Sequence, residues 1–596
     1  MAIAALSDVE ASEVELREFV AAYEALRGAE RVEYCPPSDG FRAAVIAAEG
    51  WRQSALWESD GSWTAFAGVL YGVSPSPGAR LEEADGHFGL ISFDAGRRRM
   101  IVATDAFGVQ AMYVAESEGR AYVSTSAMAI ARHLRLPADR FRARSFVRTG
   151  FHVGDSTLWE GVRRLEPGTA LELGRAGRTE LFYWRPTRDE AVTRLGLAKS
   201  ADHVLEVAVG AAAAYLGSRP CTWADLSGGH DSRLLALILD RAGVDFSAAT
   251  RGDPGDEEAR VAGRVAELGG WEWRLFPYPA SWKDEAPPLL PKAVAWGDGY
   301  VPILHLARRF WKHERTAEVC PSLVGGAAGE LLRDFAWQQE FIRAGRSTRV
   351  DLGRWVDMRL LRGHVDLSLF ASDPTAAVRD DLTRRFQGWL EAYSDEPNTF
   401  QLDLLYAYRA GTGRYGGEAS AELGILTRQW PYLYRPILTA AISTHWRHRK
   451  RHRLVRQMTE RLDPVVAAVP TSWWHAPVQP MRLRTAHRFA PYYLSLGRRG
   501  ARKLTQKAFG RSFARSPAVD PRETTLRRAV LAYAGSVSGE GLDPSTMRTG
   551  PIYRQDRLGS LLAAAGRDDF RQTDVMDRIL TVELALRATD TALSDG

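Results

Sequence analysis

Six consecutive residues near the middle of the chain combine phosphate-binding and metal-binding chemistry, Ser227-Gly228-Gly229-His230-Asp231-Ser232. A short apolar strand is predicted to end at Leu226, and a helix is predicted to begin at Asp231. The two glycines lack Cβ atoms, so a polyphosphate can reach the backbone N–H groups, and the helix N-terminus adds unpaired donors and a positive dipole end. Asp231 can hold Mg²⁺, and the two serine hydroxyls can donate to phosphate oxygens. The segment is therefore a candidate polyphosphate site.

The same six residues also fit an ordinary Gly-Gly turn capped by Asp or Ser. The following segments favour phosphate binding. Residues 231–242 have the apolar face of a helix, 244–250 are predicted as a strand, 256–268 as a helix and 271–276 as a strand. This alternation predicts a parallel sheet with its ligand outside the carboxyl ends of the strands. No G-x-x-x-x-G-K-[ST] segment occurs, which excludes a Walker-type loop.

Several segments, in the same order along the chain, are similar to a known family. The Ser227–Ser232 loop resembles the pyrophosphate-binding loop of ATP pyrophosphatases, which implies cleavage of ATP between its α and β phosphates. The other matching segments resemble asparagine synthetase: residues 85–94, 104–113 and 124–126 its amidohydrolase half, residues 161–168 and 182–184 the connection, and residues 325–331 its second signature loop. The resemblance implies an α/β synthetase domain with a parallel sheet (adenine nucleotide alpha hydrolase-like), preceded by an α+β amidohydrolase-like domain of stacked sheets.

The resemblance also assigns roles to individual residues. It places ATP on two loops and Mg²⁺ on two carboxylates, Asp231 and Glu330, which are also expected to be catalytic. The residues expected to bind the nucleotide are Leu226, Ser227, Gly228, Gly229, Asp231, Ser232, Gly325 and Gly326.

The second loop departs from the family pattern at two positions. The family usually has an acidic metal ligand where this chain has Gly329, and a glutamate or a tyrosine where it has Gly326. Glu330 or Asp334 can complete the Mg²⁺ shell by a shifted geometry, or the second metal site is lost and the chain is a pseudoenzyme. The acidic residues at 256–258 fit either a functional pair or ordinary N-terminal helix acids.

The late catalytic lysine of the family has few candidates here, because only three lysines follow residue 400. Lys507 has the most similar surroundings and is the expected catalytic lysine. Arg482 or Arg484 is the alternative, since a guanidinium clamps phosphate well but carries protons poorly.

The amidohydrolase half is predicted to lack its own activity. In the family an N-terminal cysteine attacks glutamine while its own amine serves as the base, whereas Ala2 follows Met1 here. Residues 66–72 can be laid on the family's substrate loop, and this places Ala67 and Val69 where the family has an asparagine and a glutamate. Glutamine is therefore not the expected nitrogen source.

The predicted function is an AMP- and pyrophosphate-forming amide ligase that adenylates a carboxylate and transfers it to an amine or ammonia. A chain that has lost the glutaminase and kept the adenylating loop resembles the lasso-peptide and β-lactam-forming branches. In those branches the nucleophile is an amine of the same substrate. An asparagine synthetase and a noncatalytic nucleotide-binding protein remain alternatives. The expected partners are a small-molecule or peptide carboxylate and an amine, and a homodimer is left open.

The composition is consistent with this predicted function and does not distinguish among its alternatives. With 596 residues, 45% hydrophobic and 25% charged, the chain is long enough for two or three globular domains. Cys35, Cys221 and Cys320 show neither metal-type spacing nor even pairing, which favours a reducing cytoplasm. No apolar run is long enough for a membrane span, and residues 1–19 do not resemble a signal peptide.

Four segments are predicted along the chain. Residues 1–40 form a helical lead, 41–195 the amidohydrolase-like domain and connection, 196–480 the ATP-binding domain, and 481–596 a helical region. The basic segment at 446–456 fits a solvated helix face better than contact with RNA or a phosphorylated partner, because no nucleic-acid-binding module accompanies it. No nucleic-acid partner is expected.

Overall fold

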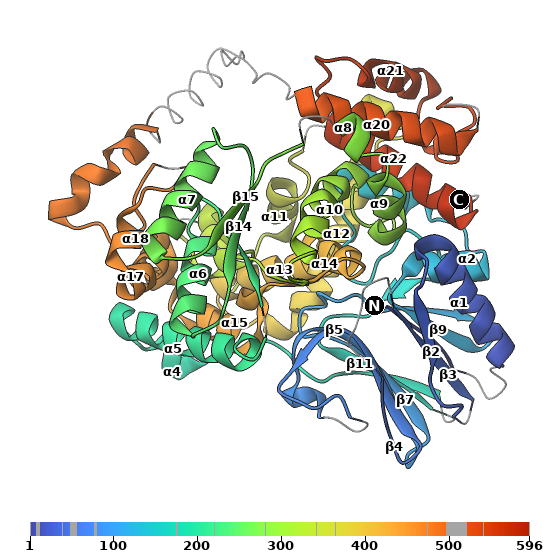
Figure 1. The fold of residues 1–596 in the computed structure, drawn as a ribbon, viewed down its shortest axis with the longest axis horizontal. Coiled ribbons are helices and arrows are strands. Elements are labelled where there is room, and N and C mark those ends of the chain that lie inside the picture. The colour runs from blue at the N-terminus through green and yellow to red at the C-terminus, as the bar shows by residue number, and fades with distance from the viewer. Residues whose placement is uncertain are drawn as a thin grey trace.

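The computed structural model contains three sheets and a helical C-terminal region (Figure 1). It describes residues 2–7, 12–38, 40–47, 56–76, 80–174, 177–219, 221–279, 282–340, 342–363, 365–473, 475–495, 497, 521–539 and 542–594.

Two antiparallel six-stranded sheets stack on each other in the first part of the chain. The first has the order β10 (Arg163–Arg164), β8 (Tyr113–Ser117), β9 (Arg120–Ser124), β1 (Ala2–Ser7), β3 (Phe41–Ala47) and β2 (Arg31–Tyr34). The second has the order β12 (Gly177–Phe182), β11 (Thr169–Gly174), β7 (Arg99–Thr104), β6 (Asp85–Asp94), β5 (Ser62–Tyr71) and β4 (Leu56–Ser59). Alternate residues of both sheets meet in one core that includes the fully buried Trp63. The predicted stacked sheets are therefore present.

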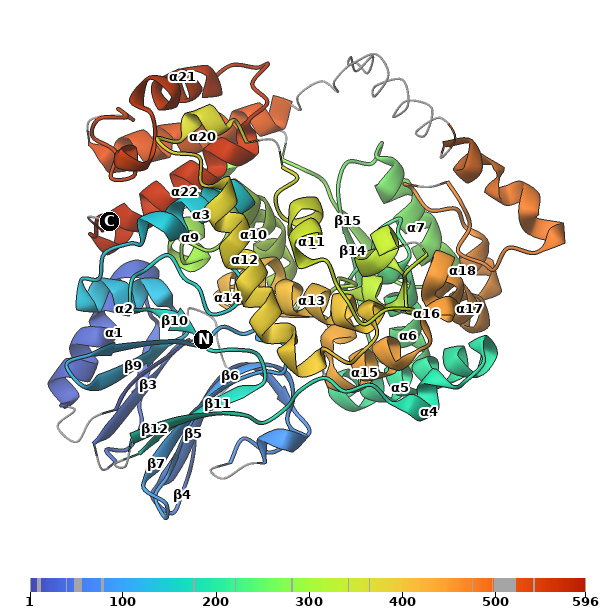
Figure 2. The ribbon, with the colours of Figure 1, turned by 180° about the vertical axis from the view of Figure 1, so that it is seen from behind.

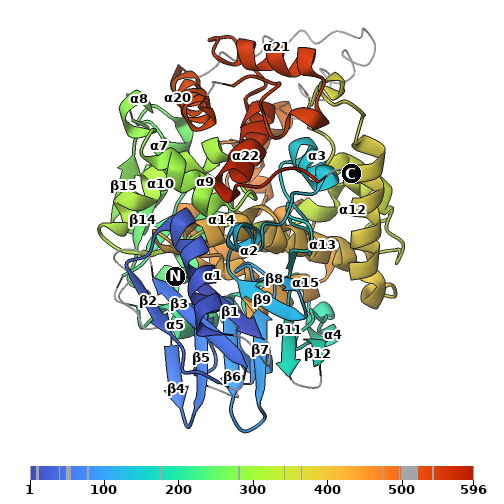
Figure 3. The ribbon, with the colours of Figure 1, turned by 90° about the vertical axis from the view of Figure 1, so that its right-hand side faces the viewer.

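Residues 1–40 are not a separate helical lead. Helix α1 (Glu13–Arg27) exists, but β1 lies inside the first sheet, between β3 and β9. Its Ile3 and Leu6 side chains are fully buried, and α1 packs with α2 (Ala127–Leu134) on the outer face of that sheet (Figure 3). The prediction failed because strand pairing joins residues more than 100 positions apart, as in Leu6 with Tyr122.

A five-stranded parallel sheet organises the second part of the chain, as predicted. Its order is β15 (Trp273–Phe276), β14 (Ser247–Arg251), β13 (Trp223–Asp225), β16 (Ser322–Val324) and β17 (Thr427–Gln429). All four pairings are parallel, and β13, which leads into the Ser227–Ser232 loop, lies at the centre. Both signature loops therefore follow neighbouring strands at the carboxyl edge of the sheet.

Helices cover both faces of the parallel sheet. Ala224 and Ala248 pack towards the face that carries α5 (Leu197–Leu216), α6 (Asp231–Arg241) and α7 (Glu257–Gly269). Trp223 and Ala249 belong to the core that contains α9 (Leu289–Gly297) and α10 (Ile303–Ala317). Further helices of this part are α8 (Trp282–Glu285), α11 (Leu352–Arg359), α12 (Thr375–Leu390), α13 (Asn398–Thr412), α14 (Arg414–Glu422), α15 (Arg435–Ser443), α16 (Trp446–Arg449), α17 (Arg453–Leu462) and α18 (Pro464–Ala468).

The C-terminal helices fold back onto both halves. They are α20 (Pro521–Ser538), α21 (Gln555–Ala565) and α22 (Thr573–Thr589). Helix α22 contacts α9 and α10 as well as α2 and α3 (Arg140–Thr149), which Figure 2 shows from behind. Among the described helices, none is both long enough and apolar enough to cross a membrane.

Hydrogen bonds join the stacked sheets directly to the parallel-sheet half. The backbone N–H of Trp430 donates to His87 Nε2 (3.0 Å), and the guanidinium of Arg435 donates to the carbonyl of Ala84 (2.6 Å). Burial lowers the pKa of His87 to about 4, so its ring is a neutral acceptor at neutral pH. The two halves therefore meet through polar contacts at the start of β6.

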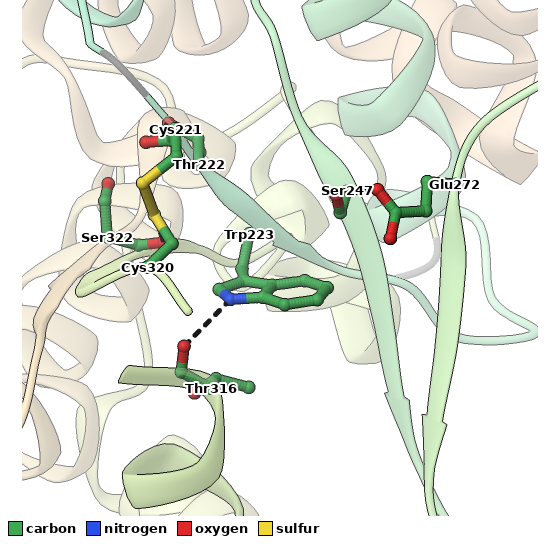
Figure 4. Close-up of a disulfide and its surroundings, with 8 residues drawn as sticks. All are labelled: Cys221, Thr222, Trp223, Ser247, Glu272, Thr316, Cys320 and Ser322. Carbon is green, nitrogen blue, oxygen red and sulfur yellow. Dashed lines mark hydrogen bonds between the residues drawn. A yellow bond between two sulfur atoms is a disulfide. The ribbon is translucent and has the colours of Figure 1, made fainter. Parts of the chain in front are cut away.

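A disulfide joins Cys221 and Cys320, which precede the neighbouring strands β13 and β16 (Figure 4). The expectation that the cysteines do not pair is therefore wrong. The two cysteines are 99 positions apart in the sequence, and the parallel pairing of β13 with β16 brings them together. Structural disulfides are uncommon in reducing compartments, so cysteine usage no longer supports a cytoplasmic location. Cys35 is free and buried.

We predict that the disulfide stabilises the fold. Replacing both cysteines (Cys221→Ser with Cys320→Ser) should lower the free energy of unfolding by about 2–4 kcal/mol, because a long loop is no longer closed in the unfolded chain. Denaturant unfolding with and without a phosphine reductant measures this effect. The reductant should destabilise the parent protein and leave the double variant unchanged. A parent protein that is insensitive to reduction would contradict the prediction.

Candidate functional site

The Ser227–Ser232 loop is folded by its own two serines. The Ser227 N–H donates to Ser232 Oγ (3.0 Å), the two hydroxyl oxygens lie 2.8 Å apart, and the Gly229 N–H donates to Ser227 Oγ (3.3 Å). Leu226 extends the sheet through its N–H, which donates to the carbonyl of Ala249 (2.9 Å). The serines thus shape the loop, and the backbone between them turns towards α6.

Helix α6 begins at this loop without a side-chain cap. His230 is the N-cap residue, and its side chain makes no capping hydrogen bond. An α-helix leaves its first N–H groups without partners inside the helix, and it carries a partial positive charge at this end. An anion is the natural partner for such an end.

The second loop packs directly on the first turn of α6. A Cβ atom added at Gly326 would lie 2.6 Å from the Ser232 backbone nitrogen, and one added at Gly329 would lie 2.6 Å from Asp231 Cβ. Neither glycine has a positive φ, so the requirement for glycine is one of space. A carboxylate at position 329 is therefore sterically excluded while α6 holds this position, and adding one there could not restore the family's ligand.

Asp231 and Glu330 come together as predicted, but a guanidinium lies with them. Arg333 Nη2 donates to Asp231 Oδ2 and lies 4.0 Å from Glu330 Oε1. Tyr406 donates its hydroxyl to Glu330 Oε2 (3.0 Å). Burial raises the pKa of the Asp231 carboxyl, Glu330 adds to the rise, and Arg333 opposes it.

The carboxylates present do not fit a bridging Mg²⁺ ion in this arrangement. Asp231 Oδ1 is buried and makes no hydrogen bond, which leaves one oxygen for a cation. However, Arg333 binds the other oxygen, and its positive charge would repel a metal placed between the two carboxylates. Over the described part of the chain, no three His, Cys, Asp or Glu side chains are grouped to hold a metal. Arg333 thus places a fixed positive charge beside both carboxylates.

Both loops open into one cavity of about 350 Å³ at the carboxyl edge of the parallel sheet. Ligand pockets commonly measure roughly 300–1,000 Å³, so the space suits a small molecule. We call it the nucleotide cavity, after the ligand that the sequence predicts for these loops, and define it by its lining: Asp225, Leu226, Ser227, Gly229, His230, Asp231, Ser232, Ala249, Thr250, Arg251, Glu258, Arg309, Lys312, His313, Gly326, Ala327, Glu330 and Arg428.

Buried ion pairs line the cavity next to the strand ends that lead into the loops. Lys312 and Arg428 both donate to the carboxylate of Asp225, at the end of β13. Arg309 binds Glu422 (2.6 Å) and Glu418 (3.2 Å) from α14. Burial acts against the charge on Asp225, but Lys312 and Arg428 outweigh it and hold the pKa of that carboxyl below its usual range. Paired buried charges of this kind fix the wall, because breaking a pair leaves an uncompensated charge.

The structure brings most of the predicted nucleotide-site residues together. Lys507 lies outside the described residues, and Gly228 and Gly325 adjoin the cavity without lining it. Arg482, an alternative to Lys507, instead forms a two-point ion pair with Glu460 at the surface. Of the acids at 256–258, only Glu258 lines the cavity.

The sequence interpretation missed two residues near the loops. Arg333 follows Glu330 by three positions, a spacing that brings side chains together on one helical face. The sequence therefore contained enough information to place Arg333 near Glu330. The ring of His452 meets that of His230 at 5.1 Å, although residues 446–456 were predicted to be a solvated face. That prediction is wrong for Arg449, which is 1% exposed and bonded to Asp403.

The amidohydrolase-like half presents no nucleophile at the start of its first strand. Strand β1 begins at Ala2, and its residues up to Leu6 are Ile, Ala, Ala and Leu. Ala67 and Val69 are buried on β5 and supply no polar group. Cys35 is buried as well, and burial raises the pKa of its thiol far above the usual range. Neither the described start of β1 nor positions 67 and 69 therefore carries a thiol or a polar side chain.

Comparisons with known proteins identify part of the chain. Residues 71–184 match the glutamine amidotransferase domain, which indicates an enzyme of amide-transfer chemistry. The match starts at the last residue of β5, so Ala2, Ala67 and Val69 lie before it. No curated protein sequence matches the chain.

Two solved structures are weakly similar. One is glutamine phosphoribosylpyrophosphate amidotransferase from B. subtilis complexed with ADP and GMP, and the other is described as the allosteric regulatory enzyme of purine biosynthesis. Each has 10% sequence identity and a TM-score of 0.23, and each alignment covers 46% of this chain and 65% of the other. The chain thus spans less than two thirds of their length, and at this score the likeness supports no argument.

We predict that Gly326 and Gly329 are required for space. Gly326→Ala and Gly329→Ala should each lower the free energy of unfolding by about 1–3 kcal/mol, because the new methyl group overpacks the first turn of α6. Thermal and denaturant unfolding measure the change. Gly255→Ala is the matched control, since a Cβ there meets nothing within 4 Å. Variants at 326 and 329 that are as stable as the control would refute the packing argument.

Proposed function

We propose that the protein is an ATP-dependent, AMP- and pyrophosphate-forming amide ligase. In this proposal the parallel-sheet half has an adenine nucleotide alpha hydrolase-like fold and an asparagine synthetase-like activity. The observation that carries it is the uncapped N-terminus of α6, set behind a Gly-Gly turn at a cavity on the carboxyl edge of the sheet. This edge is where open α/β sheets bind ligands, and a helix N-terminus favours phosphate.

The proposed reaction has two steps. A carboxylate oxygen of the substrate attacks the α-phosphorus of ATP, the bond to the bridging oxygen breaks, and pyrophosphate leaves with the electron pair. An amine nitrogen then attacks the acyl carbon, AMP leaves, and the amine loses a proton. Both steps release a phosphate anion, so fixed positive groups aimed at the leaving group lower the barrier.

Arg333 is the residue to which we assign charge neutralisation beside the loop. Its guanidinium is always protonated, and it lies with Asp231 at the start of α6, where the phosphates would meet the N–H groups. Asp231 holds the guanidinium in place, and Glu330 adds a second negative charge 4.0 Å from the same nitrogen. No step is assigned to a metal ion.

We propose further that the nitrogen does not come from glutamine bound in the same chain. The absence of a cysteine from the described part of β1 and the apolar residues at 67 and 69 support this. The amine is then free ammonia, as in an ammonia-dependent asparagine synthetase, or an amine of the same substrate, as in lasso-peptide or β-lactam formation.

Noncatalytic nucleotide binding is the second candidate. The ion pair of Asp231 with Arg333 favours it, because this pair neutralises the carboxylate that would hold the metal in the family. The two candidates differ in whether AMP forms.

We predict that the purified protein does not hydrolyse glutamine. Glutamate release in the presence of glutamine, with and without ATP, should equal that of a buffer control, because no described residue of β1 can form the thioester that the reaction needs. A glutaminase assayed in parallel sets the detection limit. Glutamate accumulation that scales with protein concentration would show the prediction to be wrong.

We predict that Arg333 is needed for nucleotide binding and for AMP formation. Arg333→Met should weaken binding of α,β-methylene-ATP by at least tenfold, because a charge-assisted hydrogen bond is worth about 1.5–3 kcal/mol. Isothermal titration calorimetry measures the binding. Arg346→Met, at an exposed arginine of the same region, is the matched control.

The same variants test the ligase proposal with ATP itself. L-Aspartate and capped peptides that contain Asp or Glu serve as candidate acids, and AMP and pyrophosphate are measured together. The parent and Arg346→Met proteins should form both products, and Arg333→Met should form neither at a comparable rate. Tight binding of the analogue without AMP formation from any acid would favour the noncatalytic candidate, and absence of analogue binding would refute both.

A further inference from the structure

A second cavity, of about 400 Å³, lies between the two halves of the chain. Its walls come from η1 (Leu81–Glu83) and the start of β6, from the connection with α4 (Glu190–Thr193), and from α5 and α15. Figures 1 and 2 show α4, α5 and α15 together beside the stacked sheets. We call it the interdomain cavity and define it by its lining: Glu82, Glu83, Asp85, Trp184, Asp189, Val192, His203, Val207, Tyr215, Arg435, Pro436, Thr439, Ala440 and Ser443. It shares no lining residue with the nucleotide cavity.

The lining carries four carboxylates, one guanidinium and one imidazole. Two of the carboxylates have local partners. Asp189 caps α4 by accepting from the backbone N–H of Ala191 (2.8 Å), and Glu83 pairs with Arg80 (2.6 Å). Asp85 differs from them because it is only 4% exposed. The lining thus has more carboxylates than cationic groups, and one of these carboxylates, Asp85, is almost fully buried.

Asp85 is only half satisfied. Its Oδ1 accepts from the backbone N–H groups of Gly86 (2.8 Å) and Arg435 (3.2 Å). Its Oδ2 is buried and makes no hydrogen bond of ordinary length, although the hydroxyl of Tyr215 lies close enough to affect the carboxyl. A buried carboxylate oxygen without a partner is costly, so a donor from a ligand would stabilise it.

The cation of the lining does not neutralise Asp85. The Arg435 guanidinium donates to the carbonyl of Ala84 (2.6 Å) and lies over the Trp184 ring at 5.1 Å. Burial raises the pKa of Asp85 to about 6, against the backbone N–H groups of Gly86 and Arg435, the nearby Tyr215 hydroxyl and the charge of Arg435. At neutral pH the group is an anion that lacks a close positive partner.

The rest of the wall is apolar. Val192, Val207, Pro436 and Ala440 offer aliphatic surface, and Trp184 and Tyr215 offer rings. The Tyr215 ring is fixed by stacking on Tyr71 at 4.6 Å. Such a wall suits a hydrocarbon chain, and aromatic faces attract cations.

We propose that the interdomain cavity binds a primary ammonium group carried on an aliphatic chain, with Asp85 as its counter-ion. An ammonium group supplies donors without acceptors, which is what the unpartnered Oδ2 needs. The chain would lie along the aliphatic side of the wall. Both a free alkylamine and a lysine side chain of a peptide have this chemistry. The site stands independently of the proposed ligase activity.

Matched probes test whether the ligand must carry a positive charge, and whether that charge comes from a free alkylamine or from a lysine side chain. n-Butylammonium is compared with n-butanol, and acetyl-Gly-Lys-Gly-amide with its norleucine analogue, by calorimetry and saturation-transfer NMR. The parent protein should bind the charged member of at least one pair at least tenfold more tightly than the neutral member. Binding of n-butylammonium alone assigns a free amine, and binding of the lysine peptide assigns a peptide ligand. Equal or undetectable binding of both members of each pair at millimolar concentration would overturn the proposal.

Variants locate the site. Asp85→Asn keeps an oxygen acceptor for the two backbone N–H groups and removes the charge, so it should weaken binding of the charged probe at least tenfold. Thr439→Phe fills the cavity from a partly exposed position and should abolish binding with Asp85 intact, which keeps the test valid if Asp85→Asn unfolds. Asp94→Asn, at the other end of β6, is the matched control and should bind as the parent does.

The variants also separate this proposal from the proposed function. Asp85→Asn and Thr439→Phe should bind α,β-methylene-ATP as the parent protein does, because neither residue lines the nucleotide cavity. Retention of probe binding by either folded variant, within threefold of the parent protein, would overturn the interdomain site. Failure of ATP binding in the parent protein would leave that result unaffected.

Discussion

Direct packing of one glycine loop on the first turn of α6 sets the geometry of the nucleotide cavity. Gly326 and Gly329 lie where a Cβ atom would press on Ser232 and Asp231. The two loops follow the neighbouring strands β13 and β16, so the parallel pairing carries the loops to the same edge and the missing side chains let them touch. The cavity, the uncapped helix end and the position of Asp231 all depend on this contact.

The same contact decides the electrostatics of the site. No carboxylate fits at position 329, so Glu330 supplies the second acid from the next residue, and Arg333 lies with it and Asp231. A guanidinium gives fixed positive charge with directional donors, whereas a metal would need several oxygen ligands that the described residues do not group together. Elsewhere in the cavity lining a carboxylate is also paired with cationic side chains, since Asp225 is held by Lys312 and Arg428.

The stacked-sheet half also contributes to the contact between the two halves. The start of β6 meets the segment after β17 through His87 with Trp430 and through Ala84 with Arg435. Tyr71 and Tyr434 both donate to Gln429 Oε1 (2.8 and 2.5 Å), next to Arg428 of the nucleotide cavity. The stacked-sheet half thus contributes one wall of the interdomain cavity and contacts Gln429, next to Arg428 of the nucleotide cavity.

The sequence by itself determined the local features of this protein. Alternating strand and helix patterns after Ser227 predicted the parallel sheet, and the glycine turns marked the loops that line a cavity at its carboxyl edge, because turns, caps and periodicity depend on neighbours within a few residues. Only the tertiary structure decided which distant residues meet. Cys221 with Cys320, β1 within the first sheet, and Asp85 in a cavity made by both halves each depend on contacts across many residues. Arg333 beside Asp231 belongs to the same group, because the packing of Gly329 on α6, and not the spacing of the residues, brings that guanidinium to the carboxylate.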